Sequence, residues 1–336
     1  MEPHKSNVDN HQGDEHLGQA QTSAAKSTPT TLQDDGTVQA PIRRRIVGVS
    51  TKMYFESQRT TDFVHSVLGM LGFPQLPEYD TANPTLSDVL SNIDVFIIPD
   101  FVSLKEVATH VRTRKWPYPP VPGKPNAERR LMVGAQDCHW QEFGAFTGQV
   151  SPLVLREAGC DLVELGHAER RRYFAETDET TAAKAAAVAR NGMIPLVCVG
   201  EMTHPADDPH HVAEAAAEDV MKQVRPVLRA IPDEQEVVFA YEPVWAIGAD
   251  EPASAAHVCA VVKRVRESPE IKDRRGLTRI VYGGSAGPGL FAKLAHEVDG
   301  LFLGRFAHDP KQFVKTMYEI AGLERTTAVA VAGPSG

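Results

Sequence analysis

Residues 239–253 read Phe-Ala-Tyr-Glu-Pro-Val-Trp-Ala-Ile-Gly-Ala-Asp-Glu-Pro-Ala, and within them an apolar run ends at a carboxylate. Residues 237–240 are strand formers and Pro243 cannot continue a ladder, so Glu242 is predicted at the carboxyl end of a strand. Residues 244–248 are apolar and end in glycine, as expected of a loop that folds over a ligand and excludes water. Taken alone, Glu242 is more often a surface glutamate that caps a strand. The segment predicts a catalytic base beside a lid, provided that the ends of other strands also carry polar or glycine-rich segments suited to an active site.

Strand-forming runs recur along the chain and alternate with helical stretches. Helical patterns cover residues 61–72, 179–191, 211–229 and 253–267. Alternating strand and helix indicates a parallel sheet with crossovers, and eight units favour a closed (β/α)8 barrel, an α/β fold. An open doubly wound sheet has the same local signals, but no G-x-G-x-x-G follows the first strand. The eight runs are residues 45–49, 95–99, 131–135, 162–165, 194–199, 237–241, 279–282 and 301–303.

The domain organisation follows from composition. Residues 1–43 are polar and lack hydrophobic periodicity, so we predict a disordered N-terminal tail, one barrel domain over residues 44–323 and a C-terminal tail over residues 324–336. Residues 72–94 and 112–130 exceed the usual loop length, and prolines are dense there. We predict extended surface excursions without a further element in both segments.

Composition also limits the partners. The chain has 336 residues, 42% of them hydrophobic, and a net charge of -9, which argues against nucleic acid and anionic membranes as partners. No run approaches the roughly 18 apolar residues that a membrane span requires. The four cysteines lie far apart, which suggests neither a metal site nor a disulfide framework. A reducing, cytoplasmic location is expected.

Other strand ends do carry polar residues or glycines. Lys52 follows the first predicted strand, His167 follows the fourth after a glycine, and glycine turns follow the seventh and eighth. Each feature alone is ordinary, since a lone lysine is usually surface charge and a lone histidine usually packs at a rim. The carboxyl ends of barrel strands meet at one face, so these residues are expected to lie together. The glycine turns, which leave backbone N–H groups open to an anion, are Gly283-Gly284-Ser285 and Gly304-Arg305.

Four segments carry a resemblance to a known family. They are Gly-Ala-Phe-Thr-Gly-Gln-Val-Ser-Pro (144–152), Leu-Gly-His-Ala-Glu-Arg-Arg (165–171), Ala-Tyr-Glu-Pro-Val-Trp-Ala-Ile-Gly (240–248) and Tyr-Gly-Gly-Ser (282–285). In order and spacing the chain resembles the triosephosphate isomerase family over residues 45–322. The resemblance implies an aldose-ketose isomerase that interconverts dihydroxyacetone phosphate and glyceraldehyde 3-phosphate through an enediolate, in glycolysis and gluconeogenesis, without a metal or organic cofactor.

The resemblance also implies roles for individual residues. Glu242 would be the base, His167 would polarise the carbonyl, Lys52 would stabilise the oxyanion and the phosphate, and Glu169 would orient Lys52. The loop between Gly144 and Gly148 would reach into a neighbouring subunit and form a homodimer. The residues expected to contact the substrate or its phosphate are Ser50, Lys52, Gly248, Ser285, Gly304 and Arg305.

Several positions depart from the family pattern. Ser50 and Thr51 replace Asn and Trp before the lysine, so a short hydroxyl stands where an amide normally reaches the substrate. Arg305 stands in place of a glycine beside the phosphate. Ala168 replaces a serine, and residues 250–252, Asp-Glu-Pro, replace Gly-Lys-Thr after the lid. These changes leave two alternatives open: an isomerase of another short phosphorylated ketose, such as an erythrulose phosphate, or a barrel that binds a phosphosugar or only a partner without turnover.

Overall fold

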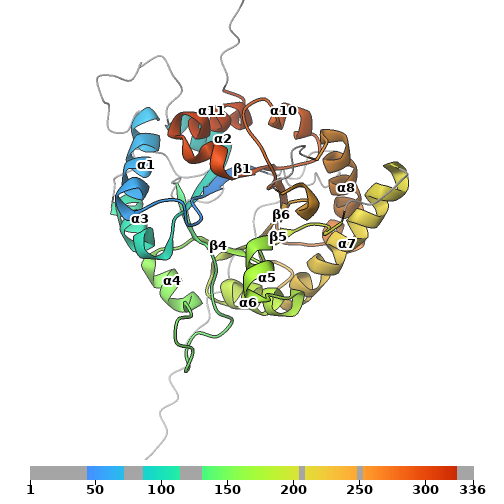
Figure 1. The fold of residues 1–336 in the computed structure, drawn as a ribbon, viewed down its shortest axis with the longest axis horizontal. Helices are drawn as coiled ribbons and strands as arrows, with labels where there is room; N and C mark the ends of the chain where they lie inside the picture. The colour runs from blue at the N-terminus through green and yellow to red at the C-terminus, as the bar shows by residue number, and fades with distance from the viewer. Residues whose placement is uncertain (1–43, 72–85, 114–130, 204–208, 248–252, 324–336) are drawn as a thin grey trace, which may run out of the picture. The chain divides into compact units, whose positions relative to one another are not determined.

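Eight parallel strands close into a barrel in sequence order, and β1 pairs with both β2 and β8 (Figure 1). The structure, a computed structural model, describes residues 44–71, 86–113, 131–203, 209–247 and 253–323. The predictions made for residues 1–43, 324–336, 114–130, Gly248 and residues 250–252 lie outside these ranges. The prediction of a closed (β/α)8 barrel is confirmed, and the open doubly wound sheet is excluded.

The strands agree with the predicted runs to within two residues at either end. They are β1 (Arg45–Ser50), β2 (Ile93–Ile98), β3 (Met132–Ala135), β4 (Leu162–Leu165), β5 (Ile194–Val199), β6 (Val237–Tyr241), β7 (Thr278–Tyr282) and β8 (Gly300–Leu303).

Helices ring the barrel on the outside (Figure 1). None of the helices in the described part of the chain combines the length and apolar character that a membrane crossing requires. The α-helices are α1 (Ser57–Met70), α2 (Leu86–Asn92), α3 (Phe101–Thr113), α4 (Pro152–Ala158), α5 (Ala168–Phe174), α6 (Asp178–Arg190), α7 (Pro209–Ala230), α8 (Ala255–Glu267), α9 (Pro269–Lys272), α10 (Phe291–Leu294) and α11 (Pro310–Ala321), and the 3-10 helices are η1 (Val244–Ala246) and η2 (Arg305–His308).

Alternate strand residues serve two separate cores. One set packs between the strands and the helices, while the other fills the barrel lumen. Space in the lumen is so limited that a Cβ added at Gly48 would lie 2.2 Å from the ring of Phe96. The lumen core includes Ile46, Phe96, Ile98, Leu162, Leu196, Val238, Val281 and Phe302.

The prediction that residues 72–94 contain no further element is wrong. Helix α2 occupies Leu86–Asn92 and contacts α11, and its Val89 and Leu90 are 0% and 2% exposed. Burying two aliphatic side chains contributes about 1.5–3 kcal/mol each, enough to hold a short helix that has little stability by itself. Two turns are too few to give a recognisable 3.6-residue period in sequence.

A buried ion cluster joins α6 to the segment after β3 and to α5. Lys184 is 3% exposed, and its Nζ lies 2.7 Å from Oδ1 of Asp137 and in contact with Glu176. Nη2 of Arg170 lies 2.6 Å from Oδ2 of Asp137. Burial raises the pKa of Asp137, although Lys184 opposes this shift. The cluster anchors the helix that begins directly after His167.

Candidate active site

Three side chains predicted from different strand ends converge at one face of the barrel. Lys52 follows β1, His167 follows β4 and Glu242 follows β6. Nε2 of His167 lies 3.7 Å from Oε2 of Glu242. Nζ of Lys52 lies 2.9 Å from Oε1 of Glu169, the residue predicted to orient it. The mouth of the barrel therefore holds an acid, an imidazole and a cation within reach of one small ligand.

The imidazole of His167 has a defined tautomer. Gly166 turns the chain with φ of +65°, and His167 is the N-cap of α5. Its Nδ1 accepts a hydrogen bond of 3.1 Å from the backbone N–H of Glu169, so the ring proton is on Nε2. Burial, helped by the charge of Lys52, lowers the pKa of His167 to about 4. At neutral pH this histidine is an uncharged donor that points toward Glu242.

The carboxyl group of Glu242 is adapted to accept a proton near neutrality. Its side chain is 14% exposed, and burial raises its pKa to about 7, against the opposing charge of Lys52 and with the charge of Glu169 acting in the same direction as burial. Its backbone N–H donates to the carbonyl of Val199 at 2.9 Å. A Cβ added at Gly200 would lie only 1.8 Å from the carbonyl oxygen of Glu242, so the two backbones pack directly against each other.

Lys52 is held in an uncommon backbone conformation. Its φ is +48°, in the left-handed region that non-glycine residues rarely occupy. The side-chain amide of Gln136 donates to the Lys52 carbonyl at 2.8 Å, and Nε2 of His308 lies 3.0 Å from the carbonyl of Ser50. Burial acts to lower the pKa of Lys52, but the hydrogen bond and charge of Glu169 outweigh it, and the pKa is raised. The lysine is charged at the mouth.

The predicted phosphate end lies on the loops after β7 and β8, two strands that pair with each other. Ser285 and Arg305 are exposed, and Arg305 begins η2. A Cβ added at Gly304 would meet nothing within 4 Å, so the space beside this backbone is open. An anion could approach these three residues from solvent. Gly248, the fourth predicted phosphate ligand, lies outside the described residues.

The first turn of the predicted lid is tied to a buried carboxylate that the sequence did not indicate. Glu201 is 1% exposed, and its Oε1 accepts a 2.9 Å hydrogen bond from the indole of Trp245 in η1. The same oxygen lies 3.2 Å from the hydroxyl of Tyr241 and 2.9 Å from Nε2 of His257. Glu201 therefore links the chain directly after Glu242 to Tyr241 at the end of β6 and to His257 of α8.

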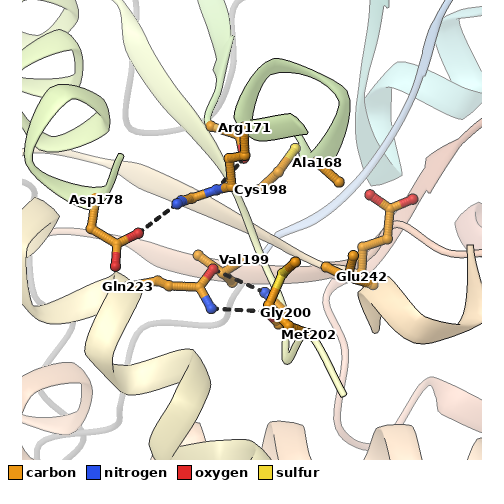
Figure 2. Close-up of a pocket in the computed structure, with 11 residues that line it drawn as sticks. Ala168, Arg171, Asp178, Cys198, Val199, Gly200, Met202, Gln223 and Glu242 are labelled. Carbon is orange, nitrogen blue, oxygen red and sulfur yellow. Dashed lines mark hydrogen bonds and ion pairs between the residues drawn. The ribbon is translucent and has the colours of Figure 1, made fainter. Parts of the chain in front are cut away.

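A cavity of about 150 Å³ lies beside Glu242. Figure 2 shows Glu242 on one side of this cavity and the ion pair of Arg171 and Asp178, 2.6 Å long, on the other. Gln223 donates to the carbonyl of Gly200 at 2.8 Å. Ala168, where the resembled family has serine, also lines the cavity.

The residue most clearly missed from sequence is Glu164. It lies on β4, is 3% exposed and forms a hydrogen bond with the hydroxyl of Ser50. Burial raises its pKa to about 8, while Lys52 and Ser50 oppose the shift. The available signal was a charged residue inside an otherwise apolar four-residue strand.

Comparison with known proteins identifies the family. The triosephosphate isomerase family model matches residues 45–320. The chain belongs to the triosephosphate isomerase family. Its members named among the relatives are isomerases, and this chain is an isomerase of the triosephosphate isomerase type, for which a small phosphorylated sugar is the fitting substrate.

The curated relatives within this family carry two different names. An L-erythrulose-1-phosphate isomerase from Pectobacterium atrosepticum is 40% identical over 280 residues, covering 82% of this chain and 96% of the relative. A second protein of that name, from Mesorhizobium japonicum, is 36% identical over 269 residues, covering 78% and 91%. A triosephosphate isomerase from Thermoanaerobacter pseudethanolicus is 31% identical over 281 residues, covering 82% and 98%.

Proposed function

We propose that this protein isomerises L-erythrulose 1-phosphate. The observation that carries the proposal is the 40% identity to a relative of that name, against 31% to a triosephosphate isomerase. The short hydroxyl of Ser50, where the family pattern has an amide, agrees with a substrate larger than a triose. The triose phosphate reaction, expected first from the sequence together with a place in glycolysis, is less well supported than this four-carbon alternative.

The proposed reaction moves a carbonyl by one carbon. In L-erythrulose 1-phosphate the phosphate is on C1, the carbonyl is C2 and C3 carries a hydroxyl and a removable proton. Loss of that proton gives the 2,3-enediolate. Protonation at C2, with transfer of the C3 hydroxyl proton to the oxygen on C2, leaves the carbonyl at C3. The product is again a ketose, with its phosphate at the opposite end when the carbons are renumbered.

The site residues supply the groups that this reaction needs. Glu242 removes the C3 proton and returns it at C2, because its raised pKa matches a base working near neutrality. His167 donates its Nε2 proton to the substrate oxygens, and Lys52, oriented by Glu169, stabilises the developing negative charge. Ser50 contacts the sugar. Backbone groups of Gly248, Ser285, Gly304 and Arg305 hold the phosphate.

We further propose that the active form is a homodimer in the cytoplasm. Large apolar side chains are exposed near the loop between Gly144 and Gly148 and after β1: Phe143 is 77%, Phe146 38% and Met53 96% exposed. A surface of this kind favours association with a second copy. The cytoplasmic location is supported by four cysteines that are all free.

The test is turnover of L-erythrulose 1-phosphate and dihydroxyacetone phosphate by the intact protein and by Glu242→Asp. We expect the four-carbon substrate to have the larger kcat/KM, and the variant to lose about 100-fold in kcat because its carboxylate is withdrawn by one methylene. A preference for the triose would overturn the substrate assignment. Inactivity on both would favour a barrel that binds phosphosugars without turnover.

A further inference from the structure

A buried acid in the lumen has no role in the proton transfers described above. Leu162 belongs to the lumen core while Val163 and Leu165 belong to the core under the helices, so Glu164 points inward with Leu162. It is 3% exposed. The opposite lumen position at the end of β1 is Ser50, which is 2% exposed and hydrogen-bonded to Glu164. The side chains of Ser50 on β1 and Glu164 on β4 thus contact each other across the barrel lumen.

This acid lies among the groups that carry out the reaction. When ionised it interacts with the charges of Lys52, Glu242 and Glu169, and burial, followed by this carboxylate, raises the pKa of the neighbouring thiol of Cys198. A carboxyl at a barrel-core position is costly to bury, and a leucine or isoleucine there would pack without that cost. A residue that lowers stability in this way at a reaction centre is typically retained because it has a function.

The ring order of the strands shows which part of a substrate would meet Glu164. The proposed phosphate ligands follow β7 and β8, and β4 lies opposite β8 in the closed ring of eight. A ligand held by its phosphate at β7 and β8, with its reacting carbons beneath His167 and Glu242, would extend its other end away from β8 and toward β4. A triose phosphate ends at the reacting carbon. A four-carbon ketose phosphate has one more hydroxymethyl group there.

We propose that Glu164, oriented by Ser50, binds the terminal hydroxyl group that distinguishes a four-carbon ketose phosphate from a triose phosphate. This inference rests on the proposed function and assigns its specificity to a residue outside the family's reacting set. A protonated carboxyl can both donate to and accept from a hydroxyl. Burial holds the pKa of Glu164 at about 8, so this form predominates at neutral pH. The neutral form also avoids adding a second negative charge beside the enediolate.

The test compares two substrates in three proteins: the intact chain, Glu164→Leu and Glu164→Gln. In Glu164→Leu, kcat/KM for L-erythrulose 1-phosphate should fall by on the order of 10- to 100-fold, the usual effect of losing one buried hydrogen bond. The value for dihydroxyacetone phosphate should stay within about threefold, since that substrate never reaches Glu164. Glu164→Gln keeps the shape and both hydrogen-bonding functions, and should retain most of the discrimination.

A matched control and a coupling measurement separate binding from packing. Leu162→Ile changes the same lumen face two residues earlier without a polar group, and should leave the ratio of the two kcat/KM values unchanged. Ser50→Ala should lower the ratio less than Glu164→Leu does. The double variant should lower it no further than Glu164→Leu alone, because the contact of Ser50 with the sugar is common to both substrates and its effect on the ratio acts through Glu164.

The failures of the two proposals look different. If the intact protein does not turn over L-erythrulose 1-phosphate, the proposed function is wrong, whatever the variants do. If the intact protein prefers that substrate but Glu164→Leu slows both substrates equally, Glu164 only tunes Lys52 and Glu242, and the specificity role is wrong. An unchanged ratio in Glu164→Leu also overturns the role.

Discussion

Nε2 of His167 and Oε2 of Glu242 lie 3.7 Å apart, and burial changes their ionisation in opposite senses. The pKa of the imidazole falls to about 4 and that of the carboxyl rises to about 7. Between these values both groups are neutral. The reactive combination of a carboxylate beside an uncharged imidazole therefore predominates only above about pH 7.

This arrangement predicts an activity that is lost in mild acid. Because the carboxylate is the active form, kcat/KM should be present above about pH 7 and fall as pH drops below it. In Glu169→Gln the midpoint should move to lower pH, because Glu169 raises the pKa of Glu242 and its loss also frees Lys52. The substrate phosphate titrates near pH 6 in both proteins and serves as an internal reference. A Glu169→Gln midpoint equal to that of the intact protein would contradict this coupling.

Arg305 is expected to strengthen phosphate binding. It is exposed beside Gly304, with its guanidinium available to an anion. Substitution by glycine should raise KM for the phosphorylated substrate and weaken competitive inhibition by inorganic phosphate, with kcat little changed. Exposed Arg172→Gly on α5 is the matched control. A fall in KM would mean that the arginine obstructs the site.

The buried ion cluster should contribute strongly to stability. Lys184→Met leaves Asp137 and Glu176 buried with Arg170 as their one remaining cation among the described residues, and breaking such a pair typically costs about 3–5 kcal/mol. Lys222→Met removes an exposed pair with Asp219 and should leave the urea midpoint nearly unchanged. Urea denaturation followed by circular dichroism measures both. Equal midpoints for the two variants would show that the cluster is not stabilising.

The buried acid of the lumen should make stability depend on pH. Between its ordinary value of 4.5 and its folded pKa of about 8, the folded protein keeps the Glu164 proton that the unfolded chain releases. Stability from this group therefore falls as pH rises through that window, by up to about 1.4 kcal/mol per pH unit. Glu164→Leu has no such proton. The difference in free energy of unfolding between this variant and the intact protein should therefore shift in favour of the variant from pH 5 to pH 8. Parallel stability curves would show that the acid is not protonated in the fold.

The proposed dimer can be tested in solution. Light scattering should give a mass near twice 36.7 kDa at micromolar concentration. Phe146→Asp places a charge in the proposed interface and should give a monomer, whereas Tyr173→Asp on exposed α5 should not. A monomeric intact protein would refute the assembly.

The sequence could predict those parts of the fold and site that depend on local pattern. The apolar runs of all eight strands are continuous, which makes the strands predictable, and Lys52, His167 and Glu242 each lie within three residues of the end of a run. Helix α2 was missed because seven residues hold too little periodicity.

Long-range relationships had no comparable signal. Lys184 and Asp137 are 47 residues apart, and nothing local marks them as a buried pair. Glu164 could not be assigned to the lumen, because in a strand of four residues buried on both faces the alternation is not visible. The proposed role of Glu164 depends on the position of β4 opposite β8 in the closed ring, which only the three-dimensional structure gives.

The bare backbone of Gly200 beside the carbonyl of Glu242 limits how this protein can diverge. Even alanine there would have to displace the main chain that carries the base, so that position offers no viable route to a new activity. Ser50 and Glu164, by contrast, project only side-chain atoms into the lumen and can be exchanged without moving that main chain. Natural variation in substrate should therefore accumulate on the inward faces of β1 and β4, while the β5–β6 junction stays invariant.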